Sequence, residues 1–302
     1  MGEYINLGIH DSGFIKEYFE KKFHCFRCAV DVNSYSWDIF SSDFYGIDPT
    51  SGCISIHRNG IVNLREYING VEDYDGVRYE FNGKILEKYL NDGSTIVVNR
   101  FENYSRFVLG LCVELSKITV NFVTGNAYIT KGGDGTFGKH WDTHCVFAIQ
   151  LKGRKRWKVY KPTQELPLSF QTSVEKKRNF NGDLVFDDVL NECDILYIPR
   201  GWWHEVNPIK GTPSLHISMG VHTPKVHDYI KWLIIRKMSD HIDFRRSINK
   251  DFIESEILYS ALERLLQDAL LKSNYDEYLN EIFHLANLRQ AFDFSNFFSV
   301  NE

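Results

Sequence analysis

Residues 140–160 read HWDTHCVFAIQLKGRKRWKVY, and this stretch decides how the rest of the chain is interpreted. It opens with His140-Trp141-Asp142 and continues as two apolar runs joined by a basic turn, which is typical of two strands in a hairpin. Side chains alternate sides along a β-strand, so His140 and Asp142 would point the same way. The stretch therefore predicts that these two residues bind one metal ion together.

A third ligand is expected from His204, which follows the strand-then-turn pattern DILYIPRGWWH, 64 positions after His140. Two imidazoles and one carboxylate on one face of an octahedral ion leave three positions open, as a non-haem Fe(II) oxygenase requires. His144 shares the parity of His140 and Asp142 and is a competing ligand. Three ligands on one strand would spread over about 13 Å, however, so a ligand from a neighbouring strand closes the geometry better.

The middle of the chain, residues 119–224, has the pattern of a barrel or sandwich. Short β-rich runs follow one another with glycines and loops between them and no intervening helices. The predicted strands are Val120–Thr124, Ala127–Thr130, Cys145–Leu151, Arg156–Tyr160, Asp194–Ile198 and Leu215–Val221.

The first 118 residues predict mixed α/β elements that support this barrel. Residues 12–23 predict a short amphipathic helix with Ser12 as its cap. Ile54–His57 and Ser94–Arg100 predict strands, and the apolar residues between Tyr104 and Lys117 recur with helical period.

Residues 225–302 predict a helical region with helices over Tyr229–Met238, Glu256–Leu271 and Asp276–Leu288. The middle helix carries an apolar stripe that must be covered by the barrel, by neighbouring helices or by a second subunit. We expect a homodimer, the commonest oligomer. The stripe consists of Ile257, Leu258, Ala261, Leu262, Leu265, Leu266 and Ala269.

Composition limits the classes of function. The 302 residues are 43% hydrophobic and can bury a full core, and a net charge of −5 gives no global attraction to nucleic acid. The basic run at 152–158 is expected to be a solvated hairpin turn. Six scattered cysteines, with the Cys25/Cys28 pair lacking a second pair for zinc, predict reduced thiols. No apolar run of 18 residues or signal-type N-terminus is present, so a cytoplasmic protein away from membranes is expected.

The segments YITKGGDGTFGKHWDTHCVFAIQLKGRKRWKVYKP (128–162), DILYIPRGWWHEV (194–206) and SLHISMGVHTP (214–224) resemble the Jumonji-C oxygenases. Within that family the sequence is most similar to the ribosomal oxygenases, which hydroxylate residues of ribosomal proteins, and more distantly similar to the asparaginyl hydroxylases. The resemblance extends over roughly residues 10–224.

The resemblance implies a mostly β fold with α elements, in which a double-stranded β-helix of the cupin type holds Fe(II) through His140, Asp142 and His204. It implies 2-oxoglutarate as co-substrate and O₂ as oxidant. The family's lysine for the distal carboxylate of 2-oxoglutarate falls 15 positions after the first metal histidine, which here is Lys155. Strand alternation agrees, since Lys155 shares parity with Trp157 whereas its arginine neighbours would face outward unless a bulge exchanges them.

Other positions are expected to complete the cavity. His216 lies where relatives place Asn or His near the C1 carboxylate of 2-oxoglutarate, with a core histidine as the alternative. Tyr128 and Thr136 could donate hydroxyl hydrogen bonds to the same ligand or serve only in packing. Trp202 and Trp203 could shape the substrate mouth or belong to the core.

The expected activity is therefore hydroxylation of a protein or peptide side chain, with a ribosomal protein as candidate substrate. Three alternatives stay open: N-methyl-lysine demethylation with the same oxidant, a non-catalytic metal-binding cupin that acts as sensor or scaffold, and an ordinary cupin isomerase or dioxygenase. Relatives that demethylate usually prefer Glu as the carboxylate ligand, and ordinary cupins usually carry His-x-His with a later Glu. Asp142 departs from both patterns.

Overall fold

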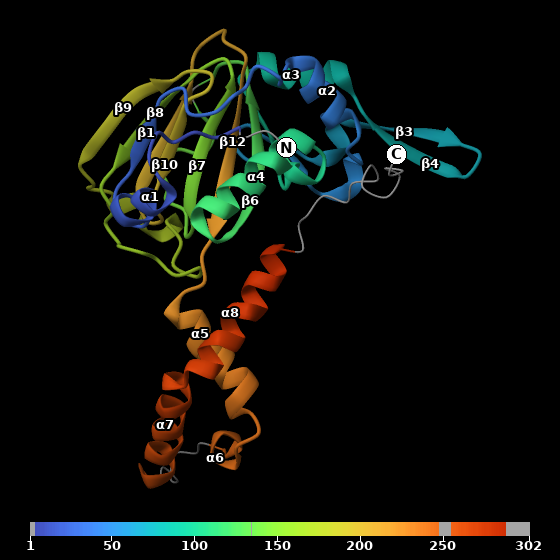
Figure 1. The fold of residues 1–302 in the computed structure, drawn as a ribbon. Coiled ribbons are helices and arrows are strands. Elements are labelled where there is room, and N and C mark those ends of the chain that lie inside the picture. Colours follow the sequence, from blue (N-terminus) through green and yellow to red (C-terminus); the bar gives the residue numbers. More distant parts are fainter. Residues whose placement is uncertain (1–3, 134, 248–254, 288–302) are drawn as a thin grey trace, which may run out of the picture. The chain divides into compact units, whose positions relative to one another are not determined.

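The computed structural model describes residues 4–133, 135–247 and 255–287, and the chain divides into two compact units, Met1–His222 and Thr223–Glu302. Figure 1 shows the strands of the first unit and the helices of the second. The first two of the three predicted regions share one sheet and so lie in one unit.

The main sheet of the first unit has seven strands, each antiparallel to its neighbours, in the order β1-β10-β7-β12-β6-β5-β2. Strands β7 and β10 are largely apolar and buried, because the sheet is covered on both faces. The N-terminal strands β2 and β5 extend one side of the sheet, and β1 forms the other edge. The bounds are β1 (His24–Phe26), β2 (Ile54–His57), β5 (Thr95–Val98), β6 (Phe122–Thr130), β7 (Cys145–Lys152), β10 (Ile195–Ile198) and β12 (Ser214–His222).

A second sheet of three antiparallel strands has the order β11-β8-β9, with β8 (Lys155–Tyr160), β9 (Leu184–Leu190) and β11 (Trp203–Pro208). One apolar cluster joins the two sheets: Val146, Ala148, Leu196 and Ile198 from the main sheet and Trp157, Val159 and Leu190 from the second. Two antiparallel sheets packed face to face confirm the predicted double-stranded β-helix.

The N-terminal elements cover the outer face of the main sheet, where α4 packs on β6 and β12 (Figure 1). Helix α4 begins at the capping residue Ser105, and its buried face joins the core through Val108, Leu111 and Leu115. The helices are α1 (Asp11–Glu17), α2 (Trp37–Tyr45), α3 (Gly83–Asn91) and α4 (Arg106–Thr119), and β3 (Ile68–Asp73) with β4 (Gly76–Phe81) forms a separate exposed hairpin.

Several details differ from the sequence predictions, and α2, α3, β1, β3 and β4 were not predicted. The first helix ends at Glu17 instead of residue 23, and its cap is His10, whose side chain accepts a hydrogen bond from the amide of Ser12. The two strands predicted between 120 and 130 are one strand, β6. Strand β9 was not predicted, because its LVFDDVL sequence carries two adjacent acidic residues and lies at an exposed edge.

The second unit consists of helices α5 (Val226–Leu233), which continues as a π-helical turn over Ile234–Met238, α6 (Ile242–Arg245), α7 (Ser255–Leu270) and α8 (Lys272–Asn287). Its core includes Tyr229, Leu233, Tyr278, Leu265 and Ala269. The predicted stripe on α7 is therefore divided. Ala261, Leu265 and Ala269 face inward, Leu258, Leu262 and Leu266 are exposed, and the side chain of Ile257 lies outside the described ones.

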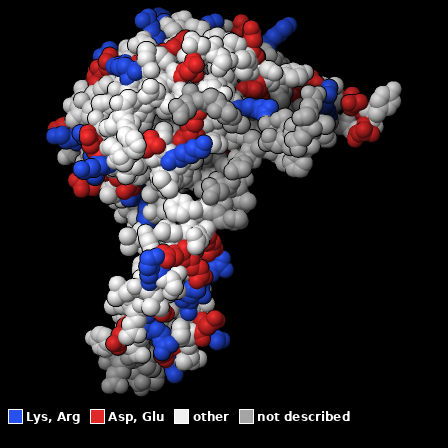
Figure 2. Space-filling view, viewed as in Figure 1, with Lys and Arg blue, Asp and Glu red and all other residues white. Residues whose placement is uncertain are grey.

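Charges of both signs are interspersed over the visible face of the molecule (Figure 2). The basic run at 152–158 is locally compensated, since Lys152 pairs with Glu192, Arg156 with Asp187 and Lys158 with Glu205. Among the described residues, no helix is both long and apolar enough to cross a membrane.

Candidate metal and co-substrate site

His140 and His204 lie opposite one another as a single backbone bridge between the loop before β7 and strand β11. The amide of His140 donates to the carbonyl of His204 at 3.0 Å, and the amide of His204 donates back at 2.8 Å. The prediction that residues 140–142 form a strand is wrong, because only His140 pairs and Asp142 lies in the irregular segment before β7. The backbone nevertheless brings the predicted ligands together.

The ligand atoms of His140, Asp142 and His204 all lie within 4.8 Å of one another, and Nε2 of His204 is 3.5 Å from Oδ2 of Asp142. Nδ1 of His140 lies 3.0 Å from the carbonyl of Gly138, and Nδ1 of His204 lies 3.2 Å from the carbonyl of Trp202. A carbonyl can only accept, so each Nδ1 donates its proton. This leaves Nε2 of each ring with a free lone pair for a metal.

The protonation states suit cation binding as well. Burial alone would raise the pKa of Asp142, but His204, His140 and His144 hold it below its usual value. Burial, together with His140, lowers the pKa of His204 to about 4. The site thus presents a carboxylate and a neutral imidazole at neutral pH, the forms that ligate metals.

His144 does not join this group. Its ring stacks on that of His222, with centroids 5.3 Å apart, and lies over Gly220 of β12. The set of ligand atoms that converge comprises His140, Asp142 and His204.

One cavity between the two sheets is lined by all seven residues predicted for the site: His140, Asp142, His204, Lys155, His216, Tyr128 and Thr136. Its wall also includes residues to which the sequence assigned no role, among them Thr95, Phe137, Trp157 and Ser218. Thr95, Trp157 and Ser218 occupy inward positions of their strands, so strand alternation was the signal that could have identified them.

Lys155 is 1% exposed, whereas Arg154 and Arg156 are exposed, as the alternation predicts. Its ammonium Nζ lies 2.9 Å from Nδ1 of His216 and donates to the carbonyl of Tyr128 at 3.3 Å. No carboxylate of the described residues lies within 4 Å of it, and burial lowers its pKa to about 7. A buried cation without a counter-charge favours binding of an anion.

The residues around Lys155 form a polar and aromatic wall. The His216 ring stacks on Tyr128, and burial with Lys155 holds the pKa of His216 well below its usual value, so His216 is neutral. Thr136 donates to the hydroxyl of Thr95 at 2.9 Å. Nε1 of Trp157 is buried without a hydrogen-bond partner among the described residues, so the wall holds a donor for an additional acceptor.

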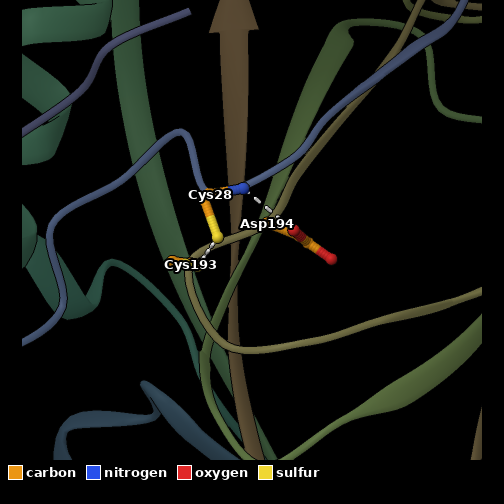
Figure 3. A group of neighbouring side chains, drawn as sticks. All are labelled: Cys28, Cys193 and Asp194. Carbon is orange, nitrogen blue, oxygen red and sulfur yellow. Dashed lines mark hydrogen bonds between the residues drawn. The ribbon is translucent and has the colours of Figure 1, made fainter.

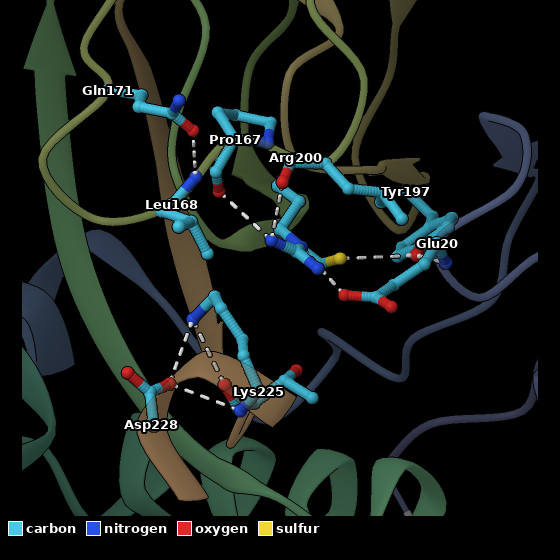
Figure 4. A network of polar contacts seen from close by, with 11 residues as sticks. Glu20, Pro167, Leu168, Gln171, Tyr197, Arg200, Lys225 and Asp228 are labelled. Carbon is cyan, nitrogen blue, oxygen red and sulfur yellow. Dashed lines mark hydrogen bonds and ion pairs between the residues drawn. The ribbon is translucent and has the colours of Figure 1, made fainter. Parts of the chain in front are cut away.

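The turn before His204 is held by Arg200, an almost buried guanidinium (Figure 4). Nε of Arg200 donates to the carboxylate of Glu20 at 2.7 Å, and Nη1 of Arg200 donates to the carbonyls of Leu166 and Pro167, both at 2.9 Å. The next residue, Gly201, donates its amide to the carbonyl of Asp142 at 3.0 Å. This turn therefore links the two segments that carry the metal ligands. Trp203 is fully buried and Trp202 packs at the edge of the core between the sheets, so both belong largely to packing.

This donor set fits Fe(II), because two imidazoles and a carboxylate on one side leave open positions for further ligands. The cavity fits 2-oxoglutarate, because it contains a buried ammonium and a buried indole donor that have no counter-charge and no acceptor, respectively, within the described part of the chain. The chemistry of these residues agrees with the expectation from the sequence.

Comparison with known proteins agrees with this fit. Residues 100–229 match the family model of the JmjC domain. The chain is 27% identical over 300 residues to the bifunctional lysine-specific demethylase and histidyl-hydroxylase NO66 of Brugia malayi, which covers 89% of this chain and 40% of that protein. Over 225 residues it is 26% identical to human ribosomal oxygenase 1, covering 70% of this chain and 35% of that protein. The chain thus spans less than half the length of these relatives.

Solved structures show the same fold. YcfD, a ribosomal oxygenase from Escherichia coli, matches with a TM-score of 0.58 and 16% identity over 93% of this chain and 72% of that one. A structure of YcfD in complex with cobalt and 2-oxoglutarate matches with the same TM-score and 17% identity. These findings confirm the resemblance noted in the sequence, since residues 100–229 match the JmjC domain model.

Proposed function

We propose that this protein is an Fe(II)- and 2-oxoglutarate-dependent oxygenase that hydroxylates a side chain of a protein or peptide. One observation carries the proposal: a single cavity is lined both by the His140/Asp142/His204 group and by Lys155, a buried lysine that no carboxylate of the described residues neutralises.

His140, Asp142 and His204 would hold Fe(II). When bound, Fe(II) with 2-oxoglutarate and O₂ supplies the oxidation of a substrate C–H bond, with release of succinate and CO₂. Lys155 would pair its ammonium with the distal carboxylate of 2-oxoglutarate, a charge-assisted hydrogen bond at a buried position. Tyr128 and the indole of Trp157 offer further donors to the carboxylate and keto oxygens, whereas the hydroxyl of Thr136 donates to Thr95.

His216 would keep Lys155 in place. As a neutral imidazole whose Nδ1 faces the ammonium, it accepts a hydrogen bond from Lys155 and so orients Nζ before the ligand arrives. Its other nitrogen could donate toward the C1 carboxylate, the role expected from its place on β12.

For the substrate we propose a protein, with ribosomal proteins as the first class to test. The proposal is supported by the names of the relatives, which are histidyl-hydroxylases, demethylases and ribosomal oxygenases. Because the name of NO66 also includes lysine demethylation, N-methyl-lysine peptides belong in the same test.

The experiment measures succinate released from 2-oxoglutarate by Fe(II)-loaded protein, alone and with a ribosomal protein fraction, followed by mass spectrometry of that fraction. A gain of one oxygen atom on a peptide identifies hydroxylation, whereas formaldehyde released from N-methyl-lysine peptides identifies demethylation. His204→Ala should abolish both signals and His144→Ala should retain them. Wild-type protein that binds Fe(II) but neither binds nor turns over 2-oxoglutarate would leave the non-catalytic cupin as the better account.

We further propose that the second unit mediates a two-fold homodimer. The exposed residues Leu258, Leu262 and Leu266 lie along one side of α7, and an apolar row of this kind is usually covered. Light scattering on Leu262→Arg/Leu266→Arg tests this, with Glu263→Arg/Gln267→Arg as a control that adds the same two arginines at exposed polar positions of the helix. A wild-type monomer at micromolar concentration would rule the dimer out.

We also propose a cytoplasmic location. The support is that all six cysteines are free thiols, a state that a reducing compartment maintains.

A further inference from the structure

Two cysteines far apart in the sequence meet at the edge of the main sheet. The sulfur atoms of Cys28 and Cys193 lie 2.9 Å apart although the residues are 165 positions apart. Strand β1 pairs with β10 so that His24 faces Tyr197 and Phe26 faces Ile195, and extension of this register by two residues places Cys28 opposite Cys193. The two cysteines therefore lie opposite each other two residues beyond Phe26 and Ile195, the last residues that pair in the ladder.

The backbone holds both cysteines in unfavourable conformations. Cys28 has φ +46° and Cys193 has φ +71°, in the left-handed region that favours glycine. Cys193 is fixed from two sides, because its amide donates to Gln150 and its carbonyl accepts from the amides of Ala29 and Val30. A side chain at such a position is costly, and here both side chains end in sulfur atoms that face each other (Figure 3).

Asp194 lies beside this pair, and the three ligand atoms lie within 4.8 Å, so a metal site must be considered. Its carboxylate, however, already accepts from the amides of Cys28 and Asn191 and from the guanidinium of Arg27 at 2.7 Å. Figure 3 shows one carboxylate oxygen at the amide of Cys28 and the other directed away from the two sulfur atoms. A cation at this place would need to displace Arg27, so the surroundings favour sulfur chemistry over metal binding.

We propose that Cys28 and Cys193 are a reversible redox pair, which an oxidant of the hydroperoxide class converts to a disulfide that fastens β1 to β10. The exposed sulfur of Cys28 attacks the peroxide, its S–O bond forms as the O–O bond breaks, and water leaves. The sulfur of Cys193 then attacks the sulfenic acid, the S–S bond forms, and the hydroxyl leaves with the thiol proton as a second water. Two thiols lose two electrons and one peroxide gains them.

The order of attack follows from the surroundings of the two sulfurs. Cys193 is half-buried, and burial together with its hydrogen bond to Cys28 raises its pKa to about 12, so it stays a thiol while Cys28 is open to the oxidant. Thiol–disulfide exchange with a reduced dithiol reverses the bond.

The bond would act on the weakest part of the sheet. Strand β1 has three residues and pairs only with β10, so it is a short edge strand that can separate from the sheet. A covalent link at its end would keep β1 attached to β10. Because the link closes a loop of about 165 residues, it would also lower the conformational entropy of the unfolded chain.

The test uses the full chain treated with one equivalent of H₂O₂, alkylated with iodoacetamide and digested with trypsin without reduction. Cys193 is the only cysteine in the tryptic peptide 179–200, but the peptide 28–58 contains both Cys28 and Cys53. Cys53→Ser therefore serves as the background and the matched control. We expect the two peptides to be linked, with a loss of two hydrogens, in wild type and Cys53→Ser and separate in Cys28→Ser or Cys193→Ser.

Oxidation should also raise the Tm by at least about 5 °C in wild type, reversibly with dithiothreitol, and should leave Cys193→Ser unchanged. Two results would overturn the proposal: full alkylation of Cys28 and Cys193 after peroxide treatment, or tight binding of Zn²⁺ by the reduced protein that Cys28→Ser abolishes.

Discussion

Replacement of Lys155 by methionine should make the ligand-free protein more stable and unable to bind 2-oxoglutarate. Methionine has a similar length and no charge, so it fits the cavity wall without desolvation of an ammonium. Burial lowers the pKa of Lys155 from 10.5 to about 7, and this difference corresponds to about 5 kcal/mol of free energy at pH values below 7. Nδ1 of His216 would lose its donor, at a cost of about 1–3 kcal/mol. We expect a net gain of about 2–4 kcal/mol at pH 6.

The gain in stability from Lys155→Met should decrease as the pH rises. Below pH 7 the lysine binds a proton in both the folded and the unfolded state, so the full burial cost is present. Between pH 7 and 10.5 only the unfolded state keeps the proton, and wild-type stability rises by about 1.4 kcal/mol per pH unit. The advantage of Lys155→Met should therefore fall to near zero at pH 9.

Urea unfolding followed by tryptophan fluorescence at pH 6 and pH 9 measures the effect. Arg154→Met, one residue earlier and exposed, is the matched control and should change stability by less than about 0.5 kcal/mol. The reasoning is refuted if Lys155→Met is less stable than wild type at pH 6, or if the difference between the two proteins is the same at both pH values.

Three further outcomes are expected. The affinity for 2-oxoglutarate should fall up to about tenfold per pH unit above pH 7, because Lys155 must then take up a proton to pair with the ligand; a flat titration-calorimetry profile from pH 6 to 9 contradicts this. Gly201→Ala should destabilise the protein by about 1–3 kcal/mol in thermal unfolding, because φ of Gly201 is +85° and an added Cβ would lie 2.5 Å from the carbonyl oxygen of Gln164. An unchanged Tm would show that the turn can relax. His204→Ala should weaken Co²⁺ binding, measured by visible absorption, at least about 100-fold while His144→Ala leaves it unchanged, and equal effects would require another ligand set.

Strand alternation predicted the orientation of Lys155, whereas most of the site residues were assigned from the resemblance to the Jumonji-C oxygenases. Lys155 faces the cavity, and its arginine neighbours face outward, because the hairpin between β7 and β8 keeps the simple parity of a β-ladder. The same reasoning failed for Asp142. Its approach to His140 depends on a single bridge and on the Gly201–Asp142 hydrogen bond, both made with a segment about 60 residues away.

Contacts between segments far apart in the sequence also explain other differences between the structure and the sequence predictions. Strand β9 packs Leu190 between the sheets and pairs Asp187 with the outward Arg156 of β8. The adjacent Asp187 and Asp188 interrupt the alternation of apolar and polar residues that would have revealed it in the sequence. The Cys28/Cys193 pair could not be predicted, because the sequence pairs Cys28 with the nearer Cys25 and only the register of β1 with β10 brings Cys193 to it. The cap of the first helix uses a histidine nitrogen, an acceptor outside the usual Ser, Thr, Asp and Asn set.

The reciprocal bridge between His140 and His204 has a consequence for evolution and engineering of the site. The main chain alone holds these two positions face to face, so their spacing does not depend on which side chains or which metal occupy them. The loops between the strands of the intervening segment can lengthen or shorten without moving these two positions, provided that the bridge survives. A cysteine or carboxylate placed at either position would inherit the same alignment. Ligand sets for other metals can therefore be introduced at these positions by single substitutions.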